Sequence, residues 1–448
     1  MRLAPSDEHE TDRGAWMTRG WIPVLLVPVA AGLCVGAAAG LPEGLAGWAG
    51  WLGRVTGTVG LACMLLAAVI SVRVPGVDRL FGGLPRLWKL HHGLGLAALV
   101  LVLTHPPLMT LAAFSRGPAA MEALLTPSAS DLAMWAGWAA VLAMIVFLAP
   151  SFRFFGNPEY QRWKGLHFVA GLALVMALVH TLMLPRSLSP LAHTLLWGTL
   201  GGLAVLVFLW RASIARPLLR RAYRIAGRET VAPDVVELSL QSDNGGIDAF
   251  RPGQLVYLVP EDESLPAGRN EEHPYTISSA PGEPVLRIAV KAQGDATSAL
   301  QQVTTGSRAR VEGPYGDFLP PRLRQRPQLW IAGGIGITPF LSAVRAMGEG
   351  VSWGDVDLFY CTDDSGRAHF LEELQAIAEQ LPGLRIHPHY FREQGLLDAE
   401  FLRDRCNAPE DRDWYVCGPL GLNQHARRLA RTMGVPRRRI RTEEFVFL

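Results

Sequence analysis

Apolar residues dominate the chain up to about Arg211, and after this point apolar and polar residues alternate over shorter distances. The first part contains six apolar stretches of the length that crosses a membrane as a helix, which is about 20 residues. These stretches are 21–40, 49–71, 88–112, 131–150, 161–184 and 191–210. They predict an α-helical bundle of six membrane spans, which we assign to residues 21–212, in contact with a lipid bilayer.

The second part of the chain contains two different patterns. The runs 235–240, 254–259 and 285–291 are typical of strands. Alternation of apolar and polar residues, together with turn-forming residues such as those at 243–246, predicts an antiparallel β-barrel over 218–322. From 325 to 448, strands and helices alternate, which predicts an α/β doubly wound domain. Its expected elements are 356–361, 368–381, 384–389, 413–416 and 420–433.

Positive charge predicts how the spans are oriented. The first 20 residues carry both charge signs and no cleavage site, so we expect no signal peptide. We expect a cytoplasmic tail over 1–20 that is disordered over 1–15. Arginine and lysine gather before the first stretch and after the second, fourth and sixth. These residues are Arg13, Arg19, Arg73, Arg79, Arg86, Lys89, Arg153, Arg162, Lys164, Arg211, Arg216, Arg220 and Arg221. By the positive-inside rule, both termini lie in the cytoplasm of a protein of the cell (inner) membrane.

Overall composition removes two classes of function. The formal charge is +2 and charged residues make up 18% of the chain, so we expect no nucleic-acid partner. The five cysteines form no Cys-x-x-Cys pair, and no disulfide framework is indicated.

Four histidines lie inside the apolar stretches, His91 and His105 in the third and His167 and His180 in the fifth. Ionisable groups are costly in hydrocarbon, so such residues indicate a functional site. The two stretches run in the same direction, and separations of 14 and 13 residues correspond to about 20 Å of helix. Two layers of paired histidines indicate two b-type haems, one above the other. The alternative is buried histidines that bond between helices or relay protons.

The direction in which each histidine points from its helix is a further test of the proposed ligands. Fourteen residues return a side chain to within about 40° of its first direction, whereas 13 residues leave it roughly 140° away. His91 therefore matches His105 better than its rival His92 does. The spacing of His167 and His180 requires tilt or a local irregularity near Gly165 or Gly171. His193 begins the sixth stretch and is expected at the outer interface.

The histidine stretches resemble a known superfamily. Leu90-His91-His92-Gly93-Leu94-Gly95, continued to Leu103-Thr104-His105, resembles the third span of the ferric reductase and NADPH oxidase superfamily. Trp163-Lys164-Gly165-Leu166-His167, continued to Val179-His180, is similar to its fifth span. The resemblance implies bis-histidine haems, with His91 paired to His167 and His105 paired to His180, which suits electron transfer.

The segment 273–281, His-Pro-Tyr-Thr-Ile-Ser-Ser-Ala-Pro, resembles the flavin motif of the ferredoxin-NADP reductase family, with His273 in place of an arginine. The resemblance implies that Tyr275 packs on the isoalloxazine, Thr276 bonds near its reactive edge and Ser279 lies towards the pyrophosphate. Segments 250–254 and 291–297 also match positions that border FAD. The alternative is a polar strand edge. The candidate FAD residues are His273, Pro274, Tyr275, Thr276, Ser278, Ser279, Lys291, Gly294 and Thr297.

Glycines follow the apolar run that begins at Leu329, before an expected helix. Such loops let the backbone approach a pyrophosphate, and helix N–H groups favour its charge. In the reductase family, the Cys417-Gly418-Pro419 segment approaches the nicotinamide, so Cys417 is expected beside the hydride-donating carbon. The alternative is a buried thiol. The candidate nucleotide residues are Gly333, Gly334, Gly336, Thr338, Pro339, Gly418 and Pro419.

A near-terminal aromatic residue covers the flavin in this family, and Phe445 matches that role, with Phe447 as its rival and a terminal core strand as the alternative. After the second expected strand, Asp363 and Asp364 favour ribose hydroxyls, whereas Arg367 could reach a 2′-phosphate. NADH is therefore favoured slightly over NADPH.

Taken together, the resemblance implies an enzyme that moves electrons from cytoplasmic NAD(P)H through FAD and two b haems to oxygen or a ferric chelate outside. Eukaryotic NADPH oxidases carry a further histidine where this chain has Met109, after Pro106-Pro107, which weakens the inference of an oxygen site. Two alternatives stay open. One is an electron-donating subunit for a periplasmic protein partner, and the other is a membrane-anchored flavin reductase without haem.

Overall fold

The computed structural model describes residues 21–71, 73, 77–148, 165–184, 188–247 and 249–443. The expected tail over 1–20, residues 149–164 and the candidates Phe445 and Phe447 lie outside the described residues. The chain divides into two compact units, one of residues 1–73 and 86–214 and one of residues 74–85 and 215–448.

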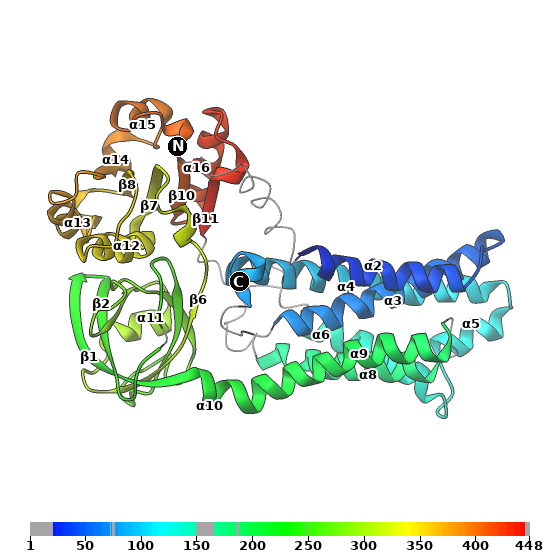
Figure 1. The fold of residues 1–448 in the computed structure, drawn as a ribbon. Helices are drawn as coiled ribbons and strands as arrows, with labels where there is room; N and C mark the ends of the chain where they lie inside the picture. The colour runs from blue at the N-terminus through cyan, green and yellow to red at the C-terminus, as the bar shows by residue number, and fades with distance from the viewer. Residues whose placement is uncertain are drawn as a thin grey trace, which may run out of the picture. The chain divides into compact units, whose positions relative to one another are not determined.

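The first unit is helical (Figure 1). Its helices are α2 (Trp21–Ala38), α3 (Gly44–Ile70), α4 (Leu84–Phe114), α5 (Pro118–Leu125), α6 (Leu132–Leu148), α8 (Val169–Met183) and α9 (Pro190–Leu209). Among the described residues, five helices are long and apolar enough to cross a membrane, namely α2, α3, α4, α9 and the helical segment Gly165–Met183. The apolar helix α6 has 17 residues. The expected helical domain is confirmed, and the number of six spans stays a prediction.

Apolar side chains point outwards from these helices. Leu33 of α2 is 68% exposed, Leu142 of α6 64% and Leu206 of α9 63%. Large exposed apolar surfaces are unfavourable in water and mark a contact with lipid or protein. Small residues and apolar side chains fill the interior instead, where α6 packs against α8 and α2 against α3.

The second unit begins with a curled antiparallel sheet in the order β4-β3-β6-β1-β2-β5. Its strands are β1 (Arg220–Ala232), β2 (Val235–Ser242), β3 (Leu255–Pro260), β4 (His273–Thr276), β5 (Leu286–Lys291) and β6 (Arg308–Tyr315). A bridge between Ile277 and Ile288 joins the two edges. The alternating apolar positions form one core, with Ile225, Leu238 and Val311 fully buried. The expected barrel is confirmed.

A parallel sheet follows in the order β11-β10-β7-β8-β9, which confirms the doubly wound domain. Its strands are β7 (Gln328–Gly333), β8 (Val356–Thr362), β9 (Leu384–Tyr390), β10 (Asp413–Cys417) and β11 (Ile440–Glu443). Helices α12 (Thr338–Gly348), α13 (Leu371–Ala378), α15 (Ala399–Arg405) and α16 (Leu420–Thr432) belong to this domain. Apolar clusters cover both faces of the sheet. The strand order reverses between β7 and β10, and ligands of such sheets bind beyond the carboxyl ends of strands at that point.

Short elements complete the described chain. They are η2 (Asp78–Phe81), the π-helix η5 (Trp210–Ala215), α10 (Arg216–Leu219), α11 (Asp295–Leu300), η6 (Pro321–Leu323), η7 (Gly334–Ile337), η8 (Ser365–Arg367), α14 (Phe391–Gln394), η9 (Pro409–Asp411) and η10 (Arg437–Arg439). The first of them, η2, packs in the second unit, where the Asp78 carboxylate accepts a hydrogen bond from the Gly316 N–H at 2.7 Å.

Candidate functional site

The four candidate haem ligands meet in two pairs. The ring centroids of His91 and His167 are 6.1 Å apart, and those of His105 and His180 are 6.2 Å apart. Metal–imidazole nitrogen bonds are about 2 Å long, so two axial nitrogens lie about 4 Å apart and their ring centroids about 6 Å apart. The pairs that the resemblance implies therefore have the separation of two ligands to one metal. His92 is exposed and lies beside His91, not across from it.

Backbone carbonyls orient three of these rings. The Nδ1 atom of His91 lies 2.9 Å from the Ala67 carbonyl oxygen, and that of His105 lies 2.7 Å from the Gly53 oxygen. His180 Nδ1 lies 2.7 Å from the Ala133 oxygen. A carbonyl oxygen only accepts, so each Nδ1 carries the hydrogen and leaves the Nε2 lone pair for a metal. This donor set fits a bis-histidine haem.

Two glycines make room for the rings of the second pair. A Cβ on Gly57 of α3 would lie 2.8 Å from His105 Nδ1, and a Cβ on Gly137 of α6 would lie 2.6 Å from His180 Nδ1. Each glycine stands four positions after the residue whose carbonyl binds the same ring. One turn of a neighbouring helix therefore holds each of these two histidines.

The spacing of His167 and His180 is accommodated by an irregular turn. The Phe168 N–H bonds to the Gly165 carbonyl, and the Gly171 N–H bonds to the Phe168 carbonyl, so both bonds span three residues. A three-residue turn winds the chain more tightly than an α-helix does. This irregularity lies at the two glycines that the spacing had indicated, and it reduces the angular mismatch.

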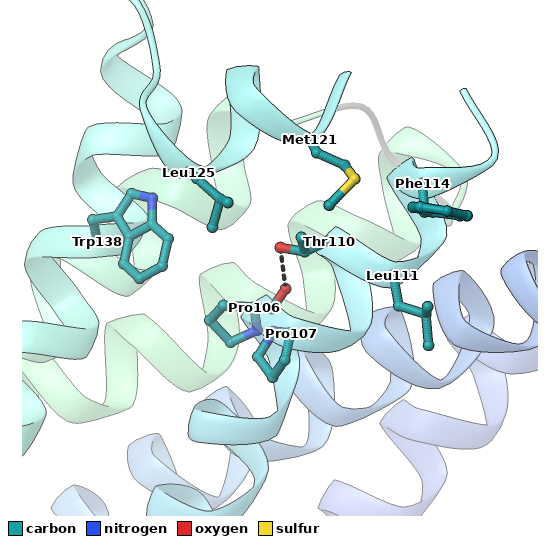
Figure 2. A pocket seen from close by; sticks show the side chains of 8 residues that line it. All are labelled: Pro106, Pro107, Thr110, Leu111, Phe114, Met121, Leu125 and Trp138. Carbon is teal, nitrogen blue, oxygen red and sulfur yellow. Dashed lines mark hydrogen bonds between the residues drawn. The ribbon is translucent and has the colours of Figure 1, made fainter. Parts of the chain in front are cut away.

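An apolar pocket of about 440 Å³ lies at the ends of α4 and α6 (Figure 2). It is lined by Pro106, Pro107, Thr110, Leu111, Phe114, Met121, Leu125 and Trp138. Pro106 follows His105 in α4, and Trp138 follows Gly137, which faces the His180 ring, in α6, so the pocket is lined from the same helix turns as the His105–His180 pair. The Thr110 hydroxyl donates to the Pro106 carbonyl and the Trp138 N–H to the Leu124 carbonyl, which leaves the walls apolar.

His193, which the sequence placed at the outer interface, is buried among the helices, with 5% of its surface exposed.

The flavin motif presents two unused polar atoms. The Tyr275 hydroxyl and the Thr276 hydroxyl are buried, and neither has a hydrogen-bond partner among the described residues. Burial raises the pKa of Tyr275, so its hydroxyl stays protonated. Buried polar groups nearly always have partners, so both atoms fit contacts to a bound cofactor. Tyr275 stands on β4, across from Val256 of β3.

The two serines of the same motif are bonded within the protein. The Ser278 hydroxyl donates to Glu237 at 2.6 Å, and the Ser279 hydroxyl accepts from the Arg287 N–H at 3.1 Å. Both serines are fully buried. Their hydroxyls are therefore committed to the protein, whereas Thr276 offers a free one.

Other candidate FAD residues have local partners. His273 Nε2 lies 3.2 Å from Glu271, and Pro274 pairs in register with Tyr257. Lys291 Nζ lies 3.8 Å from an Asp234 carboxylate oxygen. The Thr297 hydroxyl accepts from the Gly294 N–H at 3.0 Å and so supports the start of α11.

The glycine loop meets the end of β10. A Cβ on Gly336 would overlap the Cys417 carbonyl, and a Cβ on Gly333 would lie 2.5 Å from Leu422. Gly334 has a φ of +53°, which favours glycine. The loop and the Cys-Gly-Pro turn are thus adjacent at the point where the strand order reverses.

The neighbouring turn is held by side chains. Pro419 lies beside Gly333, and the Gly418 carbonyl accepts from Asn423 at 3.0 Å. The Thr338 hydroxyl donates to the Ile335 carbonyl, and Pro339 occupies the first turn of α12, where proline is favoured. The start of α12 therefore presents backbone N–H groups at this edge of the sheet.

Cys417 is fully buried. Burial and the nearby Glu443 carboxylate raise the pKa of its thiol well above the ordinary value. A thiol in this setting stays protonated and has no access to solvent, so it is suited to packing more than to acid–base chemistry.

Carboxylates and arginines alternate after β8. Arg367 lies 3.9 Å from Asp363, and Arg392 lies 3.0 Å from Asp364. The sequence interpretation missed Arg392, which is the second residue after β9. A basic residue just after β9 was the signal that could have indicated it.

Three family models match successive parts of the chain. A ferric reductase like transmembrane component matches residues 56–178, an FAD-binding domain residues 222–318 and an oxidoreductase NAD-binding domain residues 330–428. This is the architecture of the ferric reductase and NADPH oxidase superfamily. A transmembrane component of this kind with FAD-binding and NAD-binding domains indicates a membrane NAD(P)H-dependent oxidoreductase and flavoprotein.

Curated relatives match about half of the chain. The flavohemoprotein of Bordetella pertussis is 27% identical over 248 residues, and that of Chromobacterium violaceum is 28% identical over 249 residues. Each match covers 50% of this chain and 60% of the relative. A flavohemoglobin structure from Malassezia yamatoensis with bound FAD and heme is 21% identical, with a TM-score of 0.50, over 78% of this chain and 97% of that one. This last likeness concerns the fold alone.

Proposed function

We propose that the chain is a transmembrane flavocytochrome that moves electrons from cytoplasmic NAD(P)H, through FAD and two b haems, to an acceptor outside the membrane. The observation that carries this proposal is that four histidines form two pairs. In each pair, the ring centroids are separated by about the distance expected for two imidazole ligands of one metal. Within it, residues 21–212 form the haem domain, 218–322 the FAD domain and 325–448 the nucleotide domain.

The residues of the chain have distinct tasks in this proposal. His91 and His167 hold one haem, and His105 and His180 hold the other. When bound, FAD and haem supply the conversion of a two-electron hydride donor into single-electron steps. Tyr275 and Thr276 contact the flavin, and the glycine loop before α12 receives the pyrophosphate of the nucleotide. Because each pair offers two imidazole nitrogens, a haem held there would be suited to electron transfer and not to binding a substrate at its iron.

The apolar pocket favours oxygen over a ferric chelate as the acceptor. Oxygen is small, neutral and soluble in lipid, and an apolar wall admits it. A ferric chelate is charged or strongly polar, and its burial without partners is costly. The Thr110 hydroxyl and the Trp138 N–H already donate to backbone carbonyls, so neither has a hydrogen to donate to a bound chelate.

An optical spectrum of the purified protein, reduced with dithionite, tests the haem proposal. Low-spin b-type bands are expected, with two haems per chain. His105→Ala is expected to retain one haem, whereas the matched control His92→Ala retains both. A spectrum without haem bands would favour a membrane-anchored flavin reductase.

The acceptor is tested by adding NADH or NADPH together with oxygen, and separately with a ferric chelate. Faster electron flow to oxygen is expected. Reduction of the chelate alone would contradict the assignment of the pocket. Reduced haem that transfers to neither acceptor would indicate an electron-donating subunit for a periplasmic partner.

A further inference from the structure

A buried ion network joins the flavin barrel to the nucleotide domain within the second unit. Arg345 of α12 is 6% exposed, and its guanidinium donates to both carboxylate oxygens of Glu237 of β2, at 2.7 and 3.1 Å. Glu237 is 4% exposed. Burial opposes the ionisation of Glu237, but the bonds from Arg345 outweigh it and leave the pKa of Glu237 below its ordinary value.

The same helix face also bonds to the backbone of the flavin motif. Arg345 donates to the Ser278 carbonyl at 2.9 Å, and the Ser342 hydroxyl donates to the Ser279 carbonyl at 2.7 Å. Residues three apart on a helix lie on one face. Helix α12 therefore begins at the glycine loop and, one to two turns later, is fixed to the second and third residues after the strand that carries Tyr275 and Thr276.

A second branch of the network stays inside the nucleotide domain. The Arg345 guanidinium also donates to Glu373 of α13, at 2.6 and 2.8 Å, and the Glu373 side chain is 38% exposed. The chain thus offers a matched pair of carboxylates on one arginine. The bonds to Glu237, on β2 of the barrel, join the two domains, whereas the bonds to Glu373 stay within the nucleotide domain.

We propose that Arg345 is a positioning residue for hydride transfer, because it fixes the nucleotide-binding helix α12 to the flavin motif and so sets the separation of nicotinamide and flavin. This inference rests on the proposed function. In the step concerned, one hydride, a proton with two electrons, leaves the dihydronicotinamide and reduces the oxidised flavin. Misplacement by about 1 Å costs such a step roughly 100-fold in rate.

The test is anaerobic stopped-flow reduction of the flavin in the full-length purified protein, with NADH concentration varied. Glu237→Gln and Arg345→Lys are expected to lower the limiting rate of flavin reduction by about 10- to 100-fold. The NADH concentration at half-saturation should change less than about threefold. The nicotinamide–flavin charge-transfer absorbance should weaken in both variants. The control Glu373→Gln is expected to stay within about twofold of the unaltered protein.

Three results would overturn the inference. These are equal rate losses in Glu237→Gln and Glu373→Gln, unchanged rates in Glu237→Gln and Arg345→Lys, or loss of FAD from either variant, which would assign the network to flavin retention. Failure of the proposed function looks different, since the unaltered protein would then lack haem bands or leave its flavin oxidised with NADH and NADPH.

Discussion

At the scale of single residues, the proposed haem ligands are held by backbone atoms of neighbouring helices. Carbonyl groups of Gly53, Ala67 and Ala133 each bind one imidazole. A backbone carbonyl is present whatever the side chain, so a substitution at these three positions can keep the hydrogen bond to the ring. A larger side chain that points at the ring would instead collide with it. The glycines that face the rings are therefore the sensitive positions.

Gly137→Ala is expected to displace His180. The new methyl group would stand 2.6 Å from Nδ1 of a rigid ring that is also bonded to Ala133. We expect the haem content to fall from two towards one per chain, with a changed low-spin spectrum for what remains. Gly198→Ala on α9, where a Cβ meets nothing within 4 Å, is the control. Normal haem content and spectrum in Gly137→Ala would contradict this account of the ring.

Asp363→Ser is expected to shift the preference between nucleotides. Its carboxylate lies near Arg367 and would repel a 2′-phosphate, so its removal frees a cation that phosphate binds well. The value of kcat/KM for NADH divided by that for NADPH should fall by about tenfold or more. Both values are measured from the steady-state rate at which the purified protein oxidises each nucleotide with oxygen as the acceptor. The distant exposed carboxylate of Asp404 provides the control variant, Asp404→Ser. An unchanged ratio would show that Asp363 does not face the adenine ribose.

At the scale of elements, the sequence predicted those whose pattern is local. The runs 254–259 and 285–291 match β3 (Leu255–Pro260) and β5 (Leu286–Lys291) closely, because a short apolar run between turn-forming residues indicates a buried strand. All six residues of β3 are buried. Residues 91 and 167 were also assigned to one depth from span direction alone.

Contacts between distant elements left no such pattern. The carbonyls that orient the histidines belong to α3 and α6, and any helix residue has a carbonyl. The bond from Gly316 to Asp78 joins residues 238 positions apart, and the ion pair of Glu237 with Arg345 joins residues 108 apart. The glycines Gly57 and Gly137 resembled ordinary small residues of a membrane helix.

The docked element η2 gives a prediction of its own. Asp78 is 1% exposed and accepts from the buried Gly316 N–H. Asp78→Leu removes the acceptor, and a buried donor without a partner costs about 1–3 kcal/mol. We expect flavin release at a lower temperature, followed by flavin fluorescence. Asp78→Asn keeps an acceptor oxygen and should lose less. If both variants and the unaltered protein release flavin at the same temperature, the bond between Asp78 and Gly316 does not contribute to stability.

At the scale of the whole molecule, the two units differ in the surroundings that their surfaces suit. One exposes leucines and suits lipid, and the other buries its apolar residues in a barrel core and on both faces of a parallel sheet. A reporter that is active only in the cytoplasm should function when fused after Leu448. It should fail when inserted between α8 and α9, because the positive residues favour the inner side. The opposite result would reverse the direction of the proposed electron path.

The carbonyl bonds to the histidine rings also bear on how the protein matures in the cell. Three of the rings proposed as haem ligands are bonded to backbone carbonyls of neighbouring helices, and these bonds need no metal. Helix assembly and haem loading can then occur at different times. Cells starved of haem are expected to accumulate the chain in their membranes as a competent precursor, ready to acquire its pigment without new synthesis.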